Sequence, residues 1–183
     1  MEIAAPCKDC KVLCCEKFII PLTIFDIERI KNKTKLPARE FCELINYNNT
    51  DDKLFWPIYF LDKKNRLEEK LIVLKRNNGA CIFLNSKKCK IWGEHPAVCK
   101  VYPFFYFEQG EKIEYVKNFI CPRKWSGEEI EVYRIKEHLK RFKKEIATHN
   151  KIIRKWNANY ATKTEEEFFN YIKKEFSKSR DSL

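Results

Sequence analysis

The chain has 183 residues, and its 37 Lys and Arg residues against 26 Asp and Glu residues leave a formal net charge of +11. Hydrophobic residues make up 44% of the sequence and only 4 residues are glycine, which excludes a disordered, collagen-like or other fibrous chain. No stretch has the apolar run of a secretory signal peptide at the N-terminus, or the roughly 18 apolar residues of a membrane span. We therefore expect a globular, soluble, cytoplasmic protein without a membrane partner.

The first predicted elements are two helices within residues 24–46. Thr23 followed by Asp26 is a capping signal, and it predicts a first helix that begins at Ile24. Pro37 suits the first turn of a second helix, which we expect to continue to residue 46. The apolar side chains of this second helix are Phe41, Leu44 and Ile45. Together the two helices form a predicted N-terminal helical hairpin.

Short β-hairpins are predicted for the middle of the chain. Residues 54–61 and 69–75 are rich in strand-forming side chains and flank a polar turn, and Pro57 places the first of these strands at a sheet edge or a bulge. Residues 80–84 could continue this sheet. A second hairpin is expected between residues 101–107 and 113–120.

From Ser126 onwards the composition becomes charged and helical. Ser126 with Glu129 is a capping box, and apolar residues then recur at alternating spacings of three and four as far as Tyr160. Thr162 with Glu165 is a second capping signal before a last helix. We expect an α+β fold in which residues 1–122 form a cysteine-cluster metal-binding domain and residues 123–183 a charged helical extension packed on it. A dimer through these C-terminal helices is the alternative to a monomer.

Nine cysteines need another explanation than a secreted disulfide framework, because we expect a cytoplasmic protein. Eight of them stand in two blocks, and we predict that they bind metal: Cys7, Cys10, Cys14, Cys15, Cys81, Cys89, Cys99 and Cys121. A two-residue gap such as that between Cys7 and Cys10 lets a chain reversal direct two thiolates at one ion. Adjacent side chains usually diverge, so Cys14 and Cys15 would serve different sites or supply a single ligand. The ninth, Cys42, is expected to be a buried, unligated thiol on the second helix.

Eight thiolates would suit two four-cysteine sites, or one site beside redox-active or substrate-binding thiols. A zinc ribbon normally has two C-x2-C pairs, and only one is present here. Cys121-Pro122 is similar to the Cys-Pro that ends ferredoxin cluster motifs. We therefore favour an iron–sulfur cluster over Zn²⁺, and both remain open. Among other side chains, His95 is the best candidate for a ligand or an acid–base group, because it lies between two cysteines in the sequence.

The eight cysteines, the segment PLTIFDIERI and the segment CIFLNSKKCKIWGEHPAVCKVYPF resemble the CxxCxxCC family of YkgJ-like zinc- or iron-chelating domains. The resemblance covers about residues 5–122. Two features depart from the family pattern: three residues precede the double cysteine, and His95 stands where Arg is usual. The resemblance implies metal binding and a distant similarity to the cysteine-rich part of flagellin lysine-N-methylase.

Three functions follow as hypotheses. The first is an iron–sulfur protein that acts in redox chemistry or on a protein or small-molecule substrate. Binding of S-adenosylmethionine would need a cluster with an open position, since the sequence has no Gly-rich nucleotide loop. The second is a zinc-stapled module whose basic charge, with an isoelectric point near 9.2, binds nucleic acid or an acidic partner. The third, an enzyme that modifies protein lysines, rests on the family similarity alone.

Overall fold

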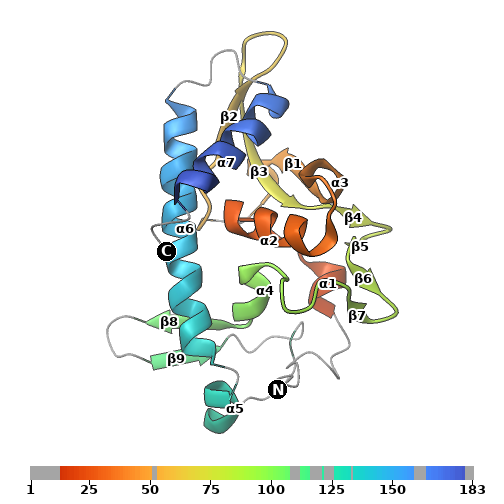
Figure 1. Ribbon diagram of the computed structural model, residues 1–183, viewed down its shortest axis with the longest axis vertical. Helices are drawn as coiled ribbons and strands as arrows, with labels where there is room; N and C mark the ends of the chain where they lie inside the picture. The colour runs from red at the N-terminus through yellow and green to blue at the C-terminus, as the bar shows by residue number, and fades with distance from the viewer. Residues whose placement is uncertain are drawn as a thin grey trace.

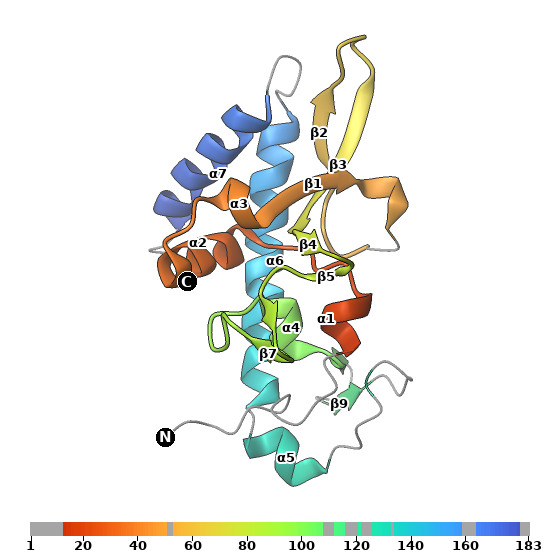
Figure 2. The same cartoon turned by 90° about the vertical axis from the view of Figure 1, so that its right-hand side faces the viewer.

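The computed structural model describes residues 13–50, 53–107, 112–115, 121, 126–132, 134–158 and 164–179. The fold is α+β, as predicted, with helices α1–α7 and short antiparallel sheets. The long helix α6 (Ile135–Asn157) runs along one side of the molecule, and the short strands of residues 76–89 lie on the opposite side (Figure 1). Figure 2 views the molecule from that opposite side. No helix in the described part of the chain combines the length and the apolar character needed to cross a bilayer.

The N-terminal region contains the predicted first helix but only a fragment of the second. After α1 (Leu13–Lys17), α2 (Ile24–Thr34) begins at a capping box in which the Thr23 hydroxyl accepts from the Asp26 N–H, and the Asp26 carboxylate accepts from the Thr23 N–H. The prediction that the second helix continues to residue 46 was wrong. The four-residue helix α3 (Ala38–Phe41) stops at Phe41, and Cys42–Asn46 forms strand β1 instead.

The three-stranded sheet explains this difference. Its order is β1-β3-β2, with β3 (Leu67–Leu74) in the centre, so β1 supplies main-chain partners along one edge of β3. If the helix continued instead, the N–H and C=O groups along this edge of β3 would be buried without hydrogen-bond partners. On the other edge, β2 (Ile58–Leu61) pairs with β3 across a tight turn, which confirms the predicted hairpin. Pro57 directly precedes this edge strand, as predicted. Tyr47–Asn49 forms a 3₁₀ turn, η1, after β1.

Residues 80–84 do not continue this sheet. Instead, β4 (Arg76–Asn77) pairs with β5 (Ala80–Cys81), and β6 (Leu84–Asn85) pairs with β7 (Lys88–Cys89), in two separate ribbons. Both turns need positive φ angles, at Asn78 and Gly79 in the first ribbon and at Ser86 and Lys87 in the second. The ribbons therefore place Cys81 and Cys89 at the ends of strands that follow tight reversals.

The second predicted hairpin is confirmed in part. After α4 (Ala97–Val101), strand β8 (Phe104–Phe107) pairs with β9 (Lys112–Tyr115). Residues 101–103 complete α4 and a turn, so the first strand begins later than expected. Residues 116–120, the second half of the other predicted strand, lie outside the described residues.

The C-terminal helices share the main hydrophobic core with the rest of the chain. Helix α5 (Gly127–Val132) precedes α6, and Arg134, whose backbone is in the left-handed conformation, separates them. The predicted continuous series of apolar residues is therefore interrupted there. Helix α7 (Glu165–Ser179) begins at a reciprocal cap between Thr164 and Glu167, two residues after the predicted Thr162–Glu165 signal, whose Thr162 lies outside the described residues. The main core joins Leu22, which precedes α2, with side chains from α2, the sheet, α6 and α7: Ile27, Ile30, Ile72, Ile153, Trp156, Phe168 and Ile172.

Candidate metal centre

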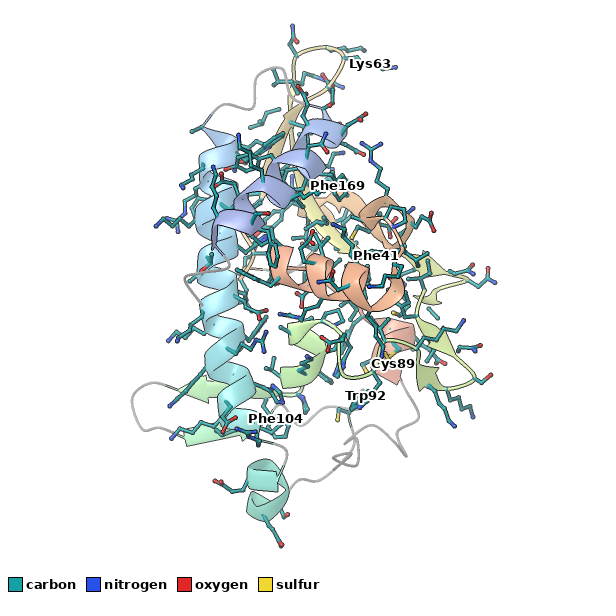
Figure 3. All side chains as sticks on the ribbon, in the orientation of Figure 1. Phe41, Lys63, Cys89, Trp92, Phe104 and Phe169 are labelled. Atoms are coloured by element: carbon teal, nitrogen blue, oxygen red, sulfur yellow. The ribbon has the colours of Figure 1, made fainter. Side chains whose placement is uncertain are left out.

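The structure brings together five of the eight predicted cysteine ligands. They come from four elements separated along the chain: Cys14 and Cys15 from α1, Cys81 from β5, Cys89 from β7 and Cys99 from α4. A charge on one of these thiols shifts the pKa of others, so the five lie within electrostatic range of one another. These elements gather on the side of α6 that Figure 2 shows at the front, and Figure 3 labels Cys89 there. We call these five residues the thiol cluster.

The remaining cysteines are placed differently. Cys7 and Cys10 lie outside the described residues. Cys121 is described and is partly buried, whereas the segments on both sides of it lie outside the described residues. Cys42 is 3% exposed within the main core, which confirms the prediction of a buried thiol, although it begins β1 rather than lying in a helix.

Cys14 and Cys15 do not diverge, contrary to the expectation from their adjacency. The Cys15 thiol donates a hydrogen bond to the Cys14 sulfur, which lowers the pKa of Cys14 to about 7. Donating this bond raises the pKa of Cys15, and burial and the charges of the neighbouring thiols raise it further. The short helix α1 therefore presents both sulfurs to one region, with one of them ready to ionise near neutral pH.

Backbone amides support the sulfurs that the two ribbons supply. The Cys81 sulfur accepts hydrogen bonds from the amides of Phe83 and Leu84, and the Cys89 sulfur accepts one from the amide of Ile91. These bonds favour the thiolate, but burial raises the pKa of both cysteines above its ordinary value. Burial also raises the pKa of Cys99 strongly, and the surrounding thiols add to this effect.

The burial of these sulfurs, their amide hydrogen bonds and their effects on one another's pKa are suited to binding a cation. Without one, each thiolate that forms opposes the ionisation of its neighbours, so most of the thiol cluster stays protonated. A bound metal ion removes this penalty, because thiolates are its ligands and their protons leave on binding. Soft sulfur donors supported by amide N–H groups suit both Zn²⁺ and iron–sulfur clusters. Within the described residues, no three His, Cys, Asp or Glu side chains already surround a single metal position.

Arg76 holds α1 against the first ribbon. Its guanidinium donates to the carbonyl oxygens of Glu16 and Phe18, at and just after the end of α1, and to that of Gly79 in the β4–β5 turn. The Phe18 ring also packs edge-on against Tyr102, with ring centroids 5.1 Å apart. These contacts fix the helix that carries Cys14 and Cys15 relative to the strand that carries Cys81. No sequence pattern points to Arg76, because its main-chain partners at α1 lie 58 and 60 residues away.

A buried ionic network positions α4 and therefore Cys99. Asp26 is completely buried, and its Oδ1 accepts a 2.8 Å hydrogen bond from the Ala97 amide at the start of α4. Arg29 binds Asp26 and makes a bidentate pair with Glu145 of α6, with N–O distances of 2.6 and 2.8 Å. Burial raises the pKa of Asp26, while the Arg29 charge and hydrogen bonds from the Thr23 and Ala97 amides oppose that rise. The capping motif predicted for α2 thus also anchors the cysteine-bearing helix.

His95 contacts Gly93 and Trp92, and the charges that act on it come from cations rather than from the thiol cluster. It is 9% exposed, its Nδ1 accepts from the Gly93 amide at 3.2 Å, and its ring stacks on Trp92 with centroids 4.4 Å apart. Burial lowers the pKa of His95 to about 3, and the charges of Lys100, His138 and Arg29 contribute to this shift. The ring is therefore neutral at physiological pH. No described interaction joins His95 to a cysteine, so a ligand role for it stays a prediction.

Comparison with known proteins yields one match. A family described as "Putative zinc- or iron-chelating domain", CxxCxxCC, matches residues 6–122. No curated protein and no solved structure matches the chain significantly. The matched region contains every residue of the thiol cluster, together with Arg76, Asp26 and Arg29, whereas Glu145 lies outside it. The chain therefore belongs to the CxxCxxCC family of zinc- or iron-chelating domains.

Proposed function

We propose that this protein is a cysteine-cluster metalloprotein that holds an iron–sulfur cluster, with one or two metal centres in total. The proposed ligands are Cys7, Cys10, Cys14, Cys15, Cys81, Cys89, Cys99 and Cys121. The observation that carries this proposal is the convergence of Cys14 and Cys15 with thiols from three further elements. Five thiols within electrostatic range exceed the four that a closed zinc site uses.

The surroundings of the thiol cluster also suit an iron–sulfur group. Cys81, Cys89 and Cys99 pack against the main core, and the Phe18–Tyr102 ring pair lies beside α1. Apolar surroundings and amide hydrogen bonds to sulfur are the features with which proteins tune such clusters. A fully ligated cluster would transfer electrons, whereas one with an open position would bind a substrate. Zn²⁺ remains the alternative occupant and would make the site structural.

Anaerobic purification followed by metal and sulfide analysis and a visible absorption spectrum tests this proposal. We expect brown protein with several iron and a matching amount of sulfide per chain. Colourless, air-stable protein containing zinc would refute the iron–sulfur proposal and leave the structural alternative.

A matched pair of variants tests the ligand assignment. Cys99→Ala removes a proposed ligand, and Cys42→Ala removes a buried thiol outside the thiol cluster. We expect Cys99→Ala to lose most of the bound metal and Cys42→Ala to retain it. Equal loss in both variants would show that metal content merely follows the stability of the fold.

The surface of α6 supports a second candidate function, a zinc-stapled module that binds nucleic acid or an acidic partner. Exposed basic residues follow this helix: Lys140, Lys143, Lys144, Lys151, Arg154 and Lys155. Arg154 also lies over the exposed Trp56 ring, 5.1 Å from its centroid. Binding to generic duplex DNA or RNA should fall steeply with salt, and Lys151→Gln should reduce the slope by about one. No binding at low salt would exclude nucleic acid as the partner.

A further inference from the structure

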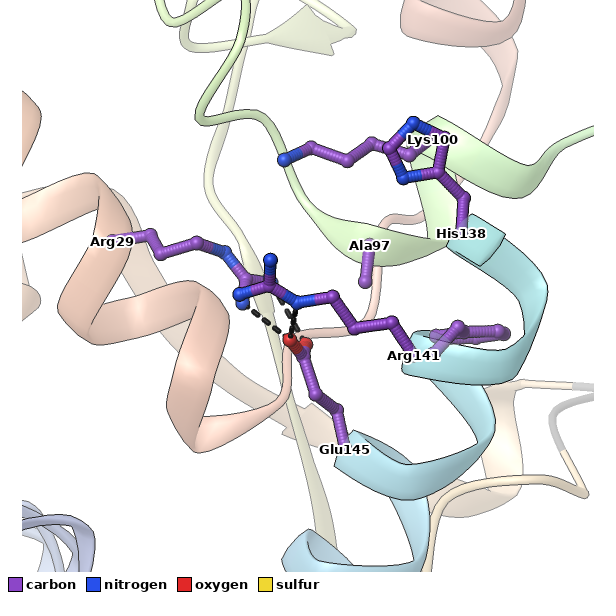
Figure 4. Close-up of a pocket in the computed structure, with 7 residues that line it drawn as sticks. Arg29, Ala97, Lys100, His138, Arg141 and Glu145 are labelled. Carbon is purple, nitrogen blue, oxygen red and sulfur yellow. Dashed lines mark hydrogen bonds and ion pairs between the residues drawn. The ribbon is translucent and has the colours of Figure 1, made fainter. Parts of the chain in front are cut away.

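A small space between α2, α4 and α6 collects positive charge from all three helices. Arg29 of α2, Lys100 of α4, and His138 and Arg141 of α6 line it, with Glu145 at its base. Figure 4 shows Arg29 and Arg141 meeting at Glu145, with Lys100 and His138 lying together apart from that contact. Arg141 has 64% of its side chain exposed, so the space opens to solvent at that residue. We call these five residues the cationic pocket.

The charges of the cationic pocket are not balanced. Arg29, Lys100 and Arg141 face two carboxylates, that of Glu145 and that of Asp26, which pairs with Arg29; this leaves a surplus of one positive charge with His138 neutral. Asp26 lies behind Arg29, where the Thr23 and Ala97 amides and Arg29 itself occupy its oxygens. Like charges held together in a partly buried space destabilise one another unless an anion joins them.

Several donors of the cationic pocket also lack partners within the described part of the chain. Lys100 forms no ion pair there, and His138 no hydrogen bond. The Nε of Arg29 is buried without an acceptor. Arg141 uses its Nε for a 2.8 Å bond to Glu145, which leaves its two terminal nitrogens available. Donors from three separate helices thus face one space without enough acceptors to satisfy them.

We propose that the cationic pocket binds a phosphate group, either as the free ion or as the monoester of a small molecule. A phosphate group carries negative charge that offsets the surplus, and it offers more acceptor oxygens than a carboxylate to the donors that lack partners. Its oxygens can accept from Lys100, His138 and Arg141 at once, because donors on different helices approach a tetrahedral group from different sides. A single Arg fork would instead have suited a planar carboxylate.

The position of this pocket relates it to the thiol cluster. Lys100 follows Cys99 directly on α4, and Asp26 fixes the start of that helix. A phosphate group bound between α4 and α6 would therefore contact the same short helix that supplies Cys99. The phosphate proposal does not depend on which metal the cysteines hold.

Calorimetric titration of the full-length, metal-containing protein with inorganic phosphate at constant ionic strength tests the proposal. We expect saturable binding of one phosphate per chain, and none of acetate at the same ionic strength. Lys100→Gln should raise the dissociation constant by about tenfold or more, as expected for loss of a charge-assisted hydrogen bond. Lys173→Gln, which removes the same charge from an exposed position of α7 outside the cationic pocket, should change it less than about twofold.

Two outcomes would overturn the proposal: no saturable phosphate binding to the wild-type protein, or equal weakening in Lys100→Gln and Lys173→Gln. His138→Gln provides a second variant that should weaken binding if Lys100→Gln does not fold. Glycerol 3-phosphate in place of inorganic phosphate distinguishes a monoester from the free ion. Metal content measured on the same samples reports the proposed metal centre separately, so failure of one proposal is distinguishable from failure of the other.

Discussion

Replacing His149 with leucine should stabilise the protein, and by more in acid than at neutral pH. His149 lies on α6 with 1% of its surface exposed, and neither ring nitrogen has a hydrogen-bond partner within the described residues. Its ring meets Phe55 edge-on at a centroid distance of 5.5 Å, beside the apolar side chains of Leu71 and Val73. Burying a polar group without a partner costs about 1–3 kcal/mol, so we expect His149→Leu to gain about 1 kcal/mol near pH 8.

The acid dependence follows from proton uptake on unfolding. Burial lowers the pKa of His149 from 6.5 to about 3, so the folded state keeps the ring neutral. Stability from this residue is therefore complete above about pH 6.5 and is lost progressively as the pH falls from there towards pH 3. At roughly pH 5 the loss is about 2 kcal/mol, from about 1.4 kcal/mol per pH unit over roughly 1.5 units.

Urea unfolding followed by tryptophan fluorescence, at about pH 8 and about pH 5, measures both effects. The advantage of His149→Leu over the wild type should widen from about 1 to about 3 kcal/mol between these pH values. Other groups that titrate in this range, including His95, are present in both proteins and cancel in the difference. A difference that stays constant with pH would refute a buried, neutral His149.

Three further changes test the supports around the candidate site. Arg76→Ala removes the donors that hold the end of α1, and we expect lower metal content with the helical circular dichroism preserved; unchanged metal affinity would mean that α1 is held without Arg76. Glu145→Gln weakens the ion pairs with Arg29 and Arg141, and it should lower the free energy of unfolding measured in urea by about 2 kcal/mol. An unchanged free energy of unfolding would contradict a stabilising role of this network. Thr164→Ala removes the cap of α7 and should cost about 1 kcal/mol, whereas Thr164→Ser should restore it.

Local signals in the sequence predicted the elements whose causes are local. Thr23 and Asp26 cap α2 because the capping box needs only residues three apart, and the β2–β3 hairpin forms around its own turn. The helix expected through Cys42 failed because β3 offers an edge that residues 42–46 pair with, and that competition is not visible within the segment itself. The sulfurs of Cys14 and Cys15 lie together for a comparable reason, since helix α1 and the hydrogen bond between the two side chains determine their directions.

The cysteines could be singled out from the sequence, but the groups that position them could not. Asp26 reaches the Ala97 amide across 71 residues, and Arg29 reaches Glu145 across 116 residues, so no spacing rule connects them. The sequence presents Asp26 only as a helix cap. In the structure the same carboxylate accepts hydrogen bonds from the Thr23 N–H, the Ala97 amide and Arg29, and each bond limits where α4 can lie.

Helix α4 is therefore the point at which the two candidate sites depend on each other. Its position is set by Asp26, whose charge is in turn compensated by Arg29, and Arg29 lines the cationic pocket. Occupying that pocket with an anion would reduce the mutual repulsion of Arg29, Lys100 and Arg141 and so hold α4 more firmly against α2 and α6. Because Cys99 lies on α4, a more firmly held helix keeps its sulfur near Cys14 and Cys81 and favours metal retention. By thermodynamic linkage, metal binding to the cysteines must then strengthen anion binding by the same factor.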